Sequence, residues 1–137
     1  MSILVDTNMI LAAADTASRD YEAALGFLEQ APEPLVVPVT VLAELDYMAN
    51  SRLGTQAEVR ILRGLAGPGF HLEPLLDEDF DRAIDLVEQY ADSDIGLVDA
   101  SIVAIAERLH VTRIATLDHR HFALIRPRHC RAFELVP

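Results

Sequence analysis

Four acidic residues stand at points of the sequence where a functional site is often built. Asp6 and Asp118 each follow directly after a short apolar run that is typical of a buried strand. Asp99 and Glu44 lie in the first turns of two expected helices. Because ligands of open parallel sheets bind at the carboxyl ends of the strands, we expect the four carboxylates to converge in one crevice.

Converging carboxylates imply a cation, because several close negative charges stay ionised only when a positive charge offsets them. A ligand set made only of oxygen favours Mg²⁺ or Mn²⁺. One or two such ions can activate water for an in-line attack on a phosphodiester, a reaction that needs no nucleophilic side chain. The sequence contains no evident Ser/His/Asp or Cys/His set, no glycine-rich phosphate loop and no zinc-type spacing of histidines.

Each acid also has a structural explanation when it is taken singly. Asp99 could cap a helix, Asp118 could form a turn and Glu44 could be a surface residue. With 22 acidic residues in the chain, some also follow strands by chance. Phosphatase-type hydrolysis is another alternative, but the first strand is followed by Asp6-Thr7-Asn8, which lacks the Asp-x-Asp arrangement of a nucleophilic site.

The elements that must position these acids alternate between short strands and amphipathic helices. The pattern predicts strands at 2–5, 35–37, 70–75, 113–117 and 133–136, and helices after Asp6, at 19–30, after Pro38, and at 55–65, 77–90 and 98–109. The helix over 98–109 is apolar nearly all round, so we expect it to be buried on more than one side. The helix over 77–90 is expected to turn five residues inward: Phe80, Ala83, Ile84, Val87 and Tyr90. Without tight hairpin signals, this alternation predicts an α/β fold with a central parallel sheet of four to five strands flanked by helices.

The size and composition are those of one folded domain that covers residues 1–137. No apolar stretch reaches the roughly 18 residues of a membrane-spanning helix, and the sequence has no pattern of a signal peptide. The single cysteine, Cys130, cannot form an internal disulfide. We therefore expect a cytoplasmic protein without a membrane anchor.

The net charge of −11 disfavours binding to nucleic acid, but the charge is unevenly distributed. The segment 108–131 contains six arginines and one acid, so it carries +5 against −16 elsewhere. This segment either contacts a phosphate backbone or forms a solvated face. The candidates for RNA contacts are Arg120, Arg126, Arg128 and Arg131.

Four segments resemble, in the same order, the motifs of PIN-domain proteins. They are Val-Asp-Thr-Asn at 5–8, Val-Leu-Ala-Glu-Leu at 41–45, Leu-Val-Asp-Ala-Ser-Ile-Val-Ala at 97–104 and Ala-Thr-Leu-Asp-His-Arg-His-Phe at 115–122. The resemblance spans nearly the whole chain, and the length is similar to that of the VapC toxins of bacterial toxin–antitoxin pairs. The α/β domain is thus expected to be PIN-like.

The resemblance implies a divalent-metal-dependent endoribonuclease in which Asp6, Glu44, Asp99 and Asp118 bind Mg²⁺ or Mn²⁺ and cleave RNA. It also implies that three residues support the site: Thr7, Asn8 and Thr116. Asp94 is a secondary candidate for the metal shell, because related proteins can carry an additional acid in this loop. The expected partners are the RNA substrate, a second copy of the chain in a homodimer, and a VapB-type antitoxin whose basic tail can enter the acidic pocket.

Two other functions remain open at this point. A PIN-domain nuclease of RNA processing or decay would have the same residues but no antitoxin. The sequence of this chain does not distinguish the two, because an antitoxin would be encoded elsewhere. A non-catalytic RNA- or protein-binding module could retain the fold, although the presence of all four acids counts against it. The sequence does not specify which RNA is cleaved or how many ions bind.

Overall fold

Five strands form one parallel sheet in the order β3-β2-β1-β4-β5. The computed structural model describes residues 1–137. The strands are β1 Ile3–Val5, β2 Leu35–Pro38, β3 Phe70–Glu73, β4 Arg113–Ala115 and β5 Glu134–Val136. This arrangement confirms the predicted α/β fold with a parallel sheet of up to five strands.

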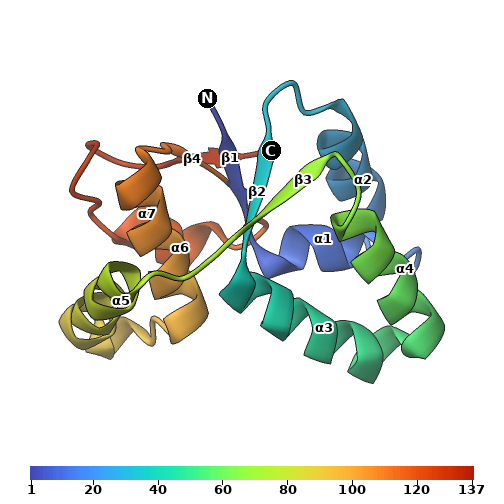
Figure 1. The fold of residues 1–137 in the computed structure, drawn as a ribbon, viewed down its shortest axis with the longest axis horizontal. Coiled ribbons are helices and arrows are strands. Elements are labelled where there is room, and N and C mark those ends of the chain that lie inside the picture. The colour runs from blue at the N-terminus through green and yellow to red at the C-terminus, as the bar shows by residue number, and fades with distance from the viewer.

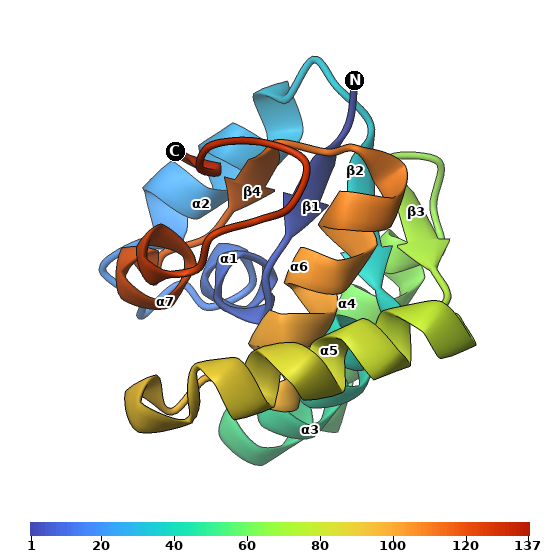
Figure 2. The same ribbon diagram turned by 90° about the vertical axis from the view of Figure 1, so that its left-hand side faces the viewer.

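Seven α-helices and one short 3-10 helix surround the sheet. They are α1 Thr7–Ala13, α2 Tyr21–Gln30, α3 Val39–Leu53, α4 Thr55–Leu65, α5 Asp77–Gln89, η1 Ala91–Ser93, α6 Leu97–Leu109 and α7 His119–Leu124. In Figure 1, α5, α6 and α7 lie on one side of the sheet and α1 to α4 on the other. Figure 2 looks onto the side where α5 packs across α6. No helix combines the length and the apolar character that a membrane crossing requires.

The core is one cluster of 31 buried residues, of which β1 and the middle of α6 are the most completely buried parts. All three residues of β1 are buried, as expected for a central parallel strand that is covered on both faces. Residues 100–106 of α6 are buried without interruption, which confirms the helix that was predicted to be surrounded on several sides.

The inward face predicted for α5 is partly wrong. Phe80 and Ile84 are 46% and 49% exposed, whereas Asp79 is 2% exposed. The physical reason is an ion pair, since Arg108 of α6 donates to both carboxylate oxygens of Asp79 at 2.9 and 3.0 Å. A paired and hydrogen-bonded carboxylate can be buried, so the buried face of α5 consists of Asp79, Ala83 and Leu86, and Phe80 and Ile84 turn towards solvent.

Two further details differ from the sequence prediction. The short helix α7 was not predicted, and it begins directly after Asp118, whose carboxylate accepts a hydrogen bond from the Arg120 backbone at 3.1 Å. Two expected strands are also shorter: the strand expected over 70–75 ends at Glu73, and the strand expected over 113–117 ends at Ala115, two residues further from Asp118 than predicted.

The sheet order places the ends of β1 and β4 side by side. Val5 is paired with Ala115, so Asp6 and Thr116 leave the same edge of the sheet from adjacent strands. The helix α3 starts at this edge after β2, which neighbours β1 on the other side. The edge therefore collects residues from three separate parts of the chain.

Candidate active site

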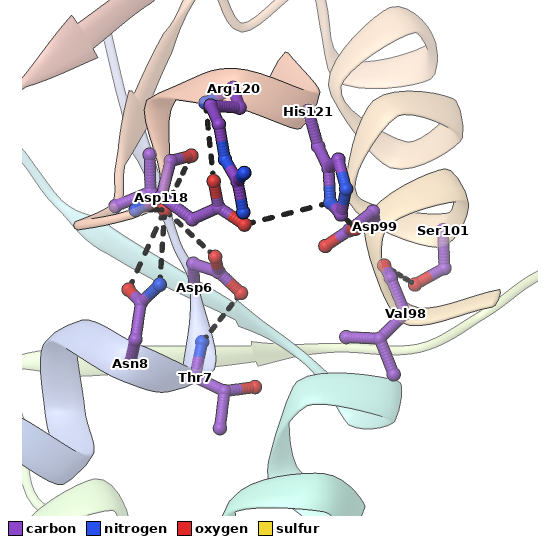
Figure 3. Close-up of polar contacts among 10 residues, drawn as sticks. Asp6, Thr7, Asn8, Val98, Asp99, Ser101, Asp118, Arg120 and His121 are labelled. Atoms are coloured by element: carbon purple, nitrogen blue, oxygen red, sulfur yellow. Dashed lines mark hydrogen bonds and ion pairs between the residues drawn. The ribbon is translucent and has the colours of Figure 1, made fainter. Parts of the chain in front are cut away.

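A cleft of about 390 Å³ opens at the carboxyl edge of the sheet. All four acids predicted from the sequence line it: Asp6, Glu44, Asp99 and Asp118. Thr7 and Asn8 also lie in its wall. Figure 3 shows Asp6 and Asp118 projecting into the same space, with Asp99 facing them from the start of α6. The predicted convergence of the acids in one crevice is thus present in the structure.

Asp6 is 5% exposed and is held by two hydrogen bonds. The Thr7 backbone amide donates to Oδ1 at 2.7 Å, so Asp6 is the N-cap of α1. The Thr116 hydroxyl donates to Oδ2 at 2.8 Å. Asn8 adds a second tie between β1 and β4, because its Oδ1 accepts the Leu117 amide at 3.0 Å. Thr116 and Asn8 thereby join the ends of the two strands.

Burial raises the pKa of Asp6 to about 6. The hydrogen bonds from Thr116 and Thr7 favour the charged form, but they do not offset the cost of removing the carboxylate from water. The negative charges of Asp99 and Glu44 raise the pKa further. The ionised site therefore lacks positive charge, and a cation would supply it.

Asp99 is half-buried and contacts a histidine. His121 Nδ1 lies 2.9 Å from Asp99 Oδ2 and 3.5 Å from Asp118 Oδ2, so the ring bridges two of the acids (Figure 3). Burial is the largest cause of a raised Asp99 pKa, which the His121 contact counteracts and the charges of Asp118 and Glu44 increase. Asp99 is not the N-cap of α6, because that position belongs to Gly96.

A hydroxyl pair connects the helices that carry Glu44 and Asp99. The Ser101 hydroxyl donates to the Val98 carbonyl at 2.7 Å and lies 2.5 Å from the Thr40 hydroxyl. This contact joins the first turn of α3 to the first turns of α6, four residues before Glu44 and two after Asp99. The Glu44 side chain itself is exposed at the rim of the cleft.

The side chains in this cleft suit a hard divalent cation. The carboxylates supply only oxygen ligands, which Mg²⁺ and Mn²⁺ prefer. Thr7 also lines the cleft, and its hydroxyl is buried without a hydrogen-bond partner. No three acidic or histidine side chains yet surround a common point. Binding a cation would therefore require rotation of side chains, for which the exposed Glu44 has the most freedom.

A model of the PIN domain family matches residues 3–126 of this chain. The chain belongs to the PIN-domain family. This PIN domain is 36% identical to Ribonuclease VapC26 of Mycobacterium tuberculosis over 135 residues, which cover 98% of this chain and 100% of that protein. The predicted resemblance to VapC-type PIN proteins is confirmed.

Solved structures of toxins share the fold of this PIN domain. The crystal structure of Mycobacterium tuberculosis VapC20, described as a sarcin-ricin loop cleaving toxin, matches with a TM-score of 0.81 at 19% identity and covers 86% of this chain and 91% of that one. A toxin–antitoxin complex from Klebsiella pneumoniae matches with a TM-score of 0.65 at 26% identity and covers 90% and 92%. VapBC2 from Rickettsia felis, bound to promoter DNA, matches with a TM-score of 0.71 at 18% identity over 100% of both chains.

The five remaining residues that the sequence singled out do not line the cleft of this PIN domain. Asp94 has a left-handed backbone with a φ of 58°, is exposed and does not line the cleft. Arg120 is exposed next to Asp118. Arg126 and Arg128 are exposed in the loop after α7, where their backbone amides donate to Tyr90 and Glu107. Arg131 is also exposed in this loop.

Two residues of the site received no role from the sequence. His121 was seen only as part of the basic segment, although it occupies the third position of α7 and faces the acids. Arg52 lines the cleft from the last turn of α3. A signal for Arg52 was present, because Glu44, Met48 and Arg52 follow one another at intervals of four residues and so share one face of the helix.

Proposed function

We propose that this PIN domain is a divalent-metal-dependent endoribonuclease and the toxin of a VapBC-type toxin–antitoxin pair in the cytoplasm. The observation that carries the proposal is the common cleft of Asp6, Glu44, Asp99 and Asp118, in which burial raises the pKa of Asp6. A nuclease that uses metal ions needs such an excess of negative charge. The identity to Ribonuclease VapC26 supports RNA as the substrate.

In this proposal the four acids hold Mg²⁺ or Mn²⁺, and the neighbouring residues keep them in position. When bound, the cation would supply an activated water and neutralise charge on the phosphodiester. Thr116 and the Thr7 amide orient the Asp6 carboxylate, and Asn8 fixes β4 against β1. His121 restrains Asp99 through Nδ1. These restraints limit the reorganisation that binding a cation requires.

An antitoxin and a homodimer belong to the same proposal. Two of the similar structures are described as a toxin–antitoxin complex and as VapBC2, which supports a protein partner. The exposed apolar side chains Phe80 and Ile84 of α5 are available for a contact between protein chains. A PIN nuclease of RNA processing would have the same cleft, but it would need no neutralising partner. Co-expression with a candidate antitoxin from a neighbouring reading frame would distinguish the two functions, because only a toxin is neutralised.

The purified protein is expected to cleave RNA only in the presence of Mg²⁺ or Mn²⁺, because the carboxylates need a cation to act together. The measurement is the disappearance of full-length RNA with EDTA, with Mg²⁺ and with Mn²⁺, followed by mapping of the new 5′ ends. Equal cleavage rates with EDTA and with Mg²⁺ would contradict the metal-dependent mechanism. An absence of cleavage under all three conditions, with RNA binding retained, would support the non-catalytic binding module.

The arginines of the basic segment are expected to guide the RNA backbone to the cleft, offsetting repulsion from the net charge of −11. Replacing Arg120, Arg126, Arg128 or Arg131 with alanine should flatten the salt dependence of RNA binding by about 0.7 for each phosphate contact to single-stranded RNA that is lost. The dissociation constant is measured against salt concentration for each variant. An unchanged slope in all four variants would reduce these arginines to a solvated face.

A further inference from the structure

A groove between α1 and α3 leads from the acids to a single arginine. One wall consists of Glu44, Met48 and Arg52 on one face of α3, and the other includes Leu11 of α1 and Ser18 of the following loop. Figure 1 shows α1 and α3 leaving the sheet on the same side, and the two helices contact each other. The cleft therefore changes in character from acidic at the sheet, through apolar, to basic at Arg52.

The guanidinium of Arg52 is free to bind a ligand. The side chain is exposed and makes no ion pair or hydrogen bond in the structure, although Asp15 and Glu44 line the same cleft. Asp15 instead uses Oδ1 to accept the Ala17 backbone amide at 3.0 Å. Arg52 is the only basic residue among those that line the cleft.

Neighbours of Arg52 fix the end of α3 without using the arginine side chain. Asn50 donates to Glu58 at 2.9 Å and to Thr55 at 3.3 Å, which ties α3 to α4. Gly54 makes the turn between these helices with a φ of 89°. Arg52 is thus held on a rigid backbone, while its charged group points at no protein partner.

We propose that this groove binds the nucleotide adjacent to the cleaved phosphodiester of a single-stranded RNA, and that Arg52 holds the neighbouring phosphate. The inference rests on the proposed nuclease function and adds the residue that anchors the substrate. Arg52 follows Glu44 by two helical turns, about 12 Å along the axis. Long side chains in a helix generally lean back towards its start, a direction that would bring the charge of Arg52 nearer to the acids.

The chemistry along the groove matches the parts of a nucleotide. A guanidinium can bind a phosphate through two parallel hydrogen bonds. The half-buried Met48 offers an apolar surface for the base, with a small contribution from the largely buried Leu11, and a thioether makes favourable contacts with aromatic rings. A volume of about 390 Å³ lies at the lower end of the range for small-ligand pockets, about 300–1,000 Å³, so the cleft has room for about one nucleotide.

The test measures RNA binding in an Asp99→Asn background, so that cleavage does not consume the ligand. A fluorescent single-stranded RNA octamer is titrated with protein in excess Mg²⁺ at several salt concentrations. Arg52→Gln should raise the dissociation constant roughly tenfold at low salt, as expected for the loss of one hydrogen bond between charged groups. It should also flatten the salt slope by about 0.7, the value for one phosphate contact to a single strand. Arg52→Lys should keep the slope and recover part of the affinity.

Arg63→Gln is the matched control. Arg63 is the basic residue in the last turn of α4, as Arg52 is in α3, and it is exposed but does not line the cleft. Its replacement removes the same charge from the same position of a helix. Because Arg63 does not line the cleft, the RNA affinity and the salt slope should stay nearly unchanged. Equal losses of RNA affinity in the two variants would show that Arg52 acts only through the net charge of the protein, which would overturn the proposal.

Other outcomes also separate the possibilities. An equal loss of affinity for duplex RNA in Arg52→Gln would overturn the single-nucleotide groove. If Arg52→Gln weakened binding of the antitoxin and left RNA binding unchanged, the groove would be a protein-docking surface instead. Because binding is measured without cleavage, a parent protein that fails to cleave RNA would refute the proposed nuclease and leave this test of the groove intact.

Discussion

Replacing Asp99 with asparagine is expected to slow RNA cleavage by about a hundredfold or more and to weaken the binding of Mn²⁺. Loss of a residue that merely orients a metal ligand already costs roughly 10–100-fold in affinity or activity, and here a proposed ligand itself is replaced. Single-turnover cleavage with excess Mg²⁺ measures the first effect, and calorimetric titration with Mn²⁺ in the absence of RNA measures the second.

The position of Asp99 makes this substitution a specific probe. Gly96 rather than Asp99 caps α6. Replacing one carboxylate oxygen of Asp99 with an amide nitrogen should therefore leave the helix intact. Two other acids serve as comparisons. Asp81→Asn changes the same chemical group on the exposed side of α5, and Asp94→Asn tests the secondary candidate, because asparagine accepts the left-handed backbone of that residue.

Both comparison variants should retain parent activity, because neither residue lines the cleft. A large loss in Asp94→Asn would instead add this residue to the metal site. Unchanged cleavage and unchanged Mn²⁺ binding in Asp99→Asn would contradict the shared metal site.

In EDTA, the difference in stability between the parent protein and Asp6→Asn is expected to change with pH by roughly 3 kcal/mol. The pKa of Asp6 rises from 3.8 to about 6 on folding, and each unit corresponds to about 1.4 kcal/mol. The folded protein therefore binds this proton more tightly than the unfolded chain. The ionised Asp6 carboxylate therefore destabilises the folded parent protein. This effect is absent below about pH 4, where Asp6 is protonated in both the folded and the unfolded state, and complete above about pH 6.

The free energy of unfolding of the two proteins, from urea titrations at several pH values, provides the measurement. The asparagine side chain of the variant can still cap α1, and any hydrogen bond it loses to Thr116 adds a term that does not depend on pH. The free energy of unfolding of Asp6→Asn should therefore increase relative to that of the parent protein as the pH rises from 4 to 7. Comparing the two proteins cancels the protonation of groups that do not interact with Asp6, such as Glu107, whose pKa burial raises but Arg82 lowers to a net decrease.

Addition of Mg²⁺ should remove much of this difference at neutral pH. A ligand that binds only the folded state adds about 2.7 kcal/mol at a hundredfold excess over its dissociation constant. The parent protein should gain this stability, and Asp6→Asn should gain much less. A parent protein indifferent to Mg²⁺, together with a difference that is flat across this pH range, would mean that Asp6 is an ordinary helix cap.

The sequence by itself determined the class of fold and the acids of the candidate site. Alternation of short strands with helices dictates a parallel sheet, and parallel strands present their carboxyl ends at one edge. Asp6 and Asp118 were therefore predictable from their place after a strand, and Glu44 and Asp99 from their place near a helix start. The positions of strands and helices can be read from the local hydrophobic periodicity, because the residues that form the buried face of one element are near one another in the sequence.

Only the tertiary structure decided which other side chains reach that site and which face of α5 is buried. His121 meets Asp99 because the short helix α7 lies against the start of α6, a contact between segments 22 residues apart. The inward turn of Asp79 depends on Arg108, 29 residues away, which offsets the cost of burying its charge. Hydrophobic periodicity assigns a carboxylate to the surface, and only the position of a distant partner can reverse that assignment.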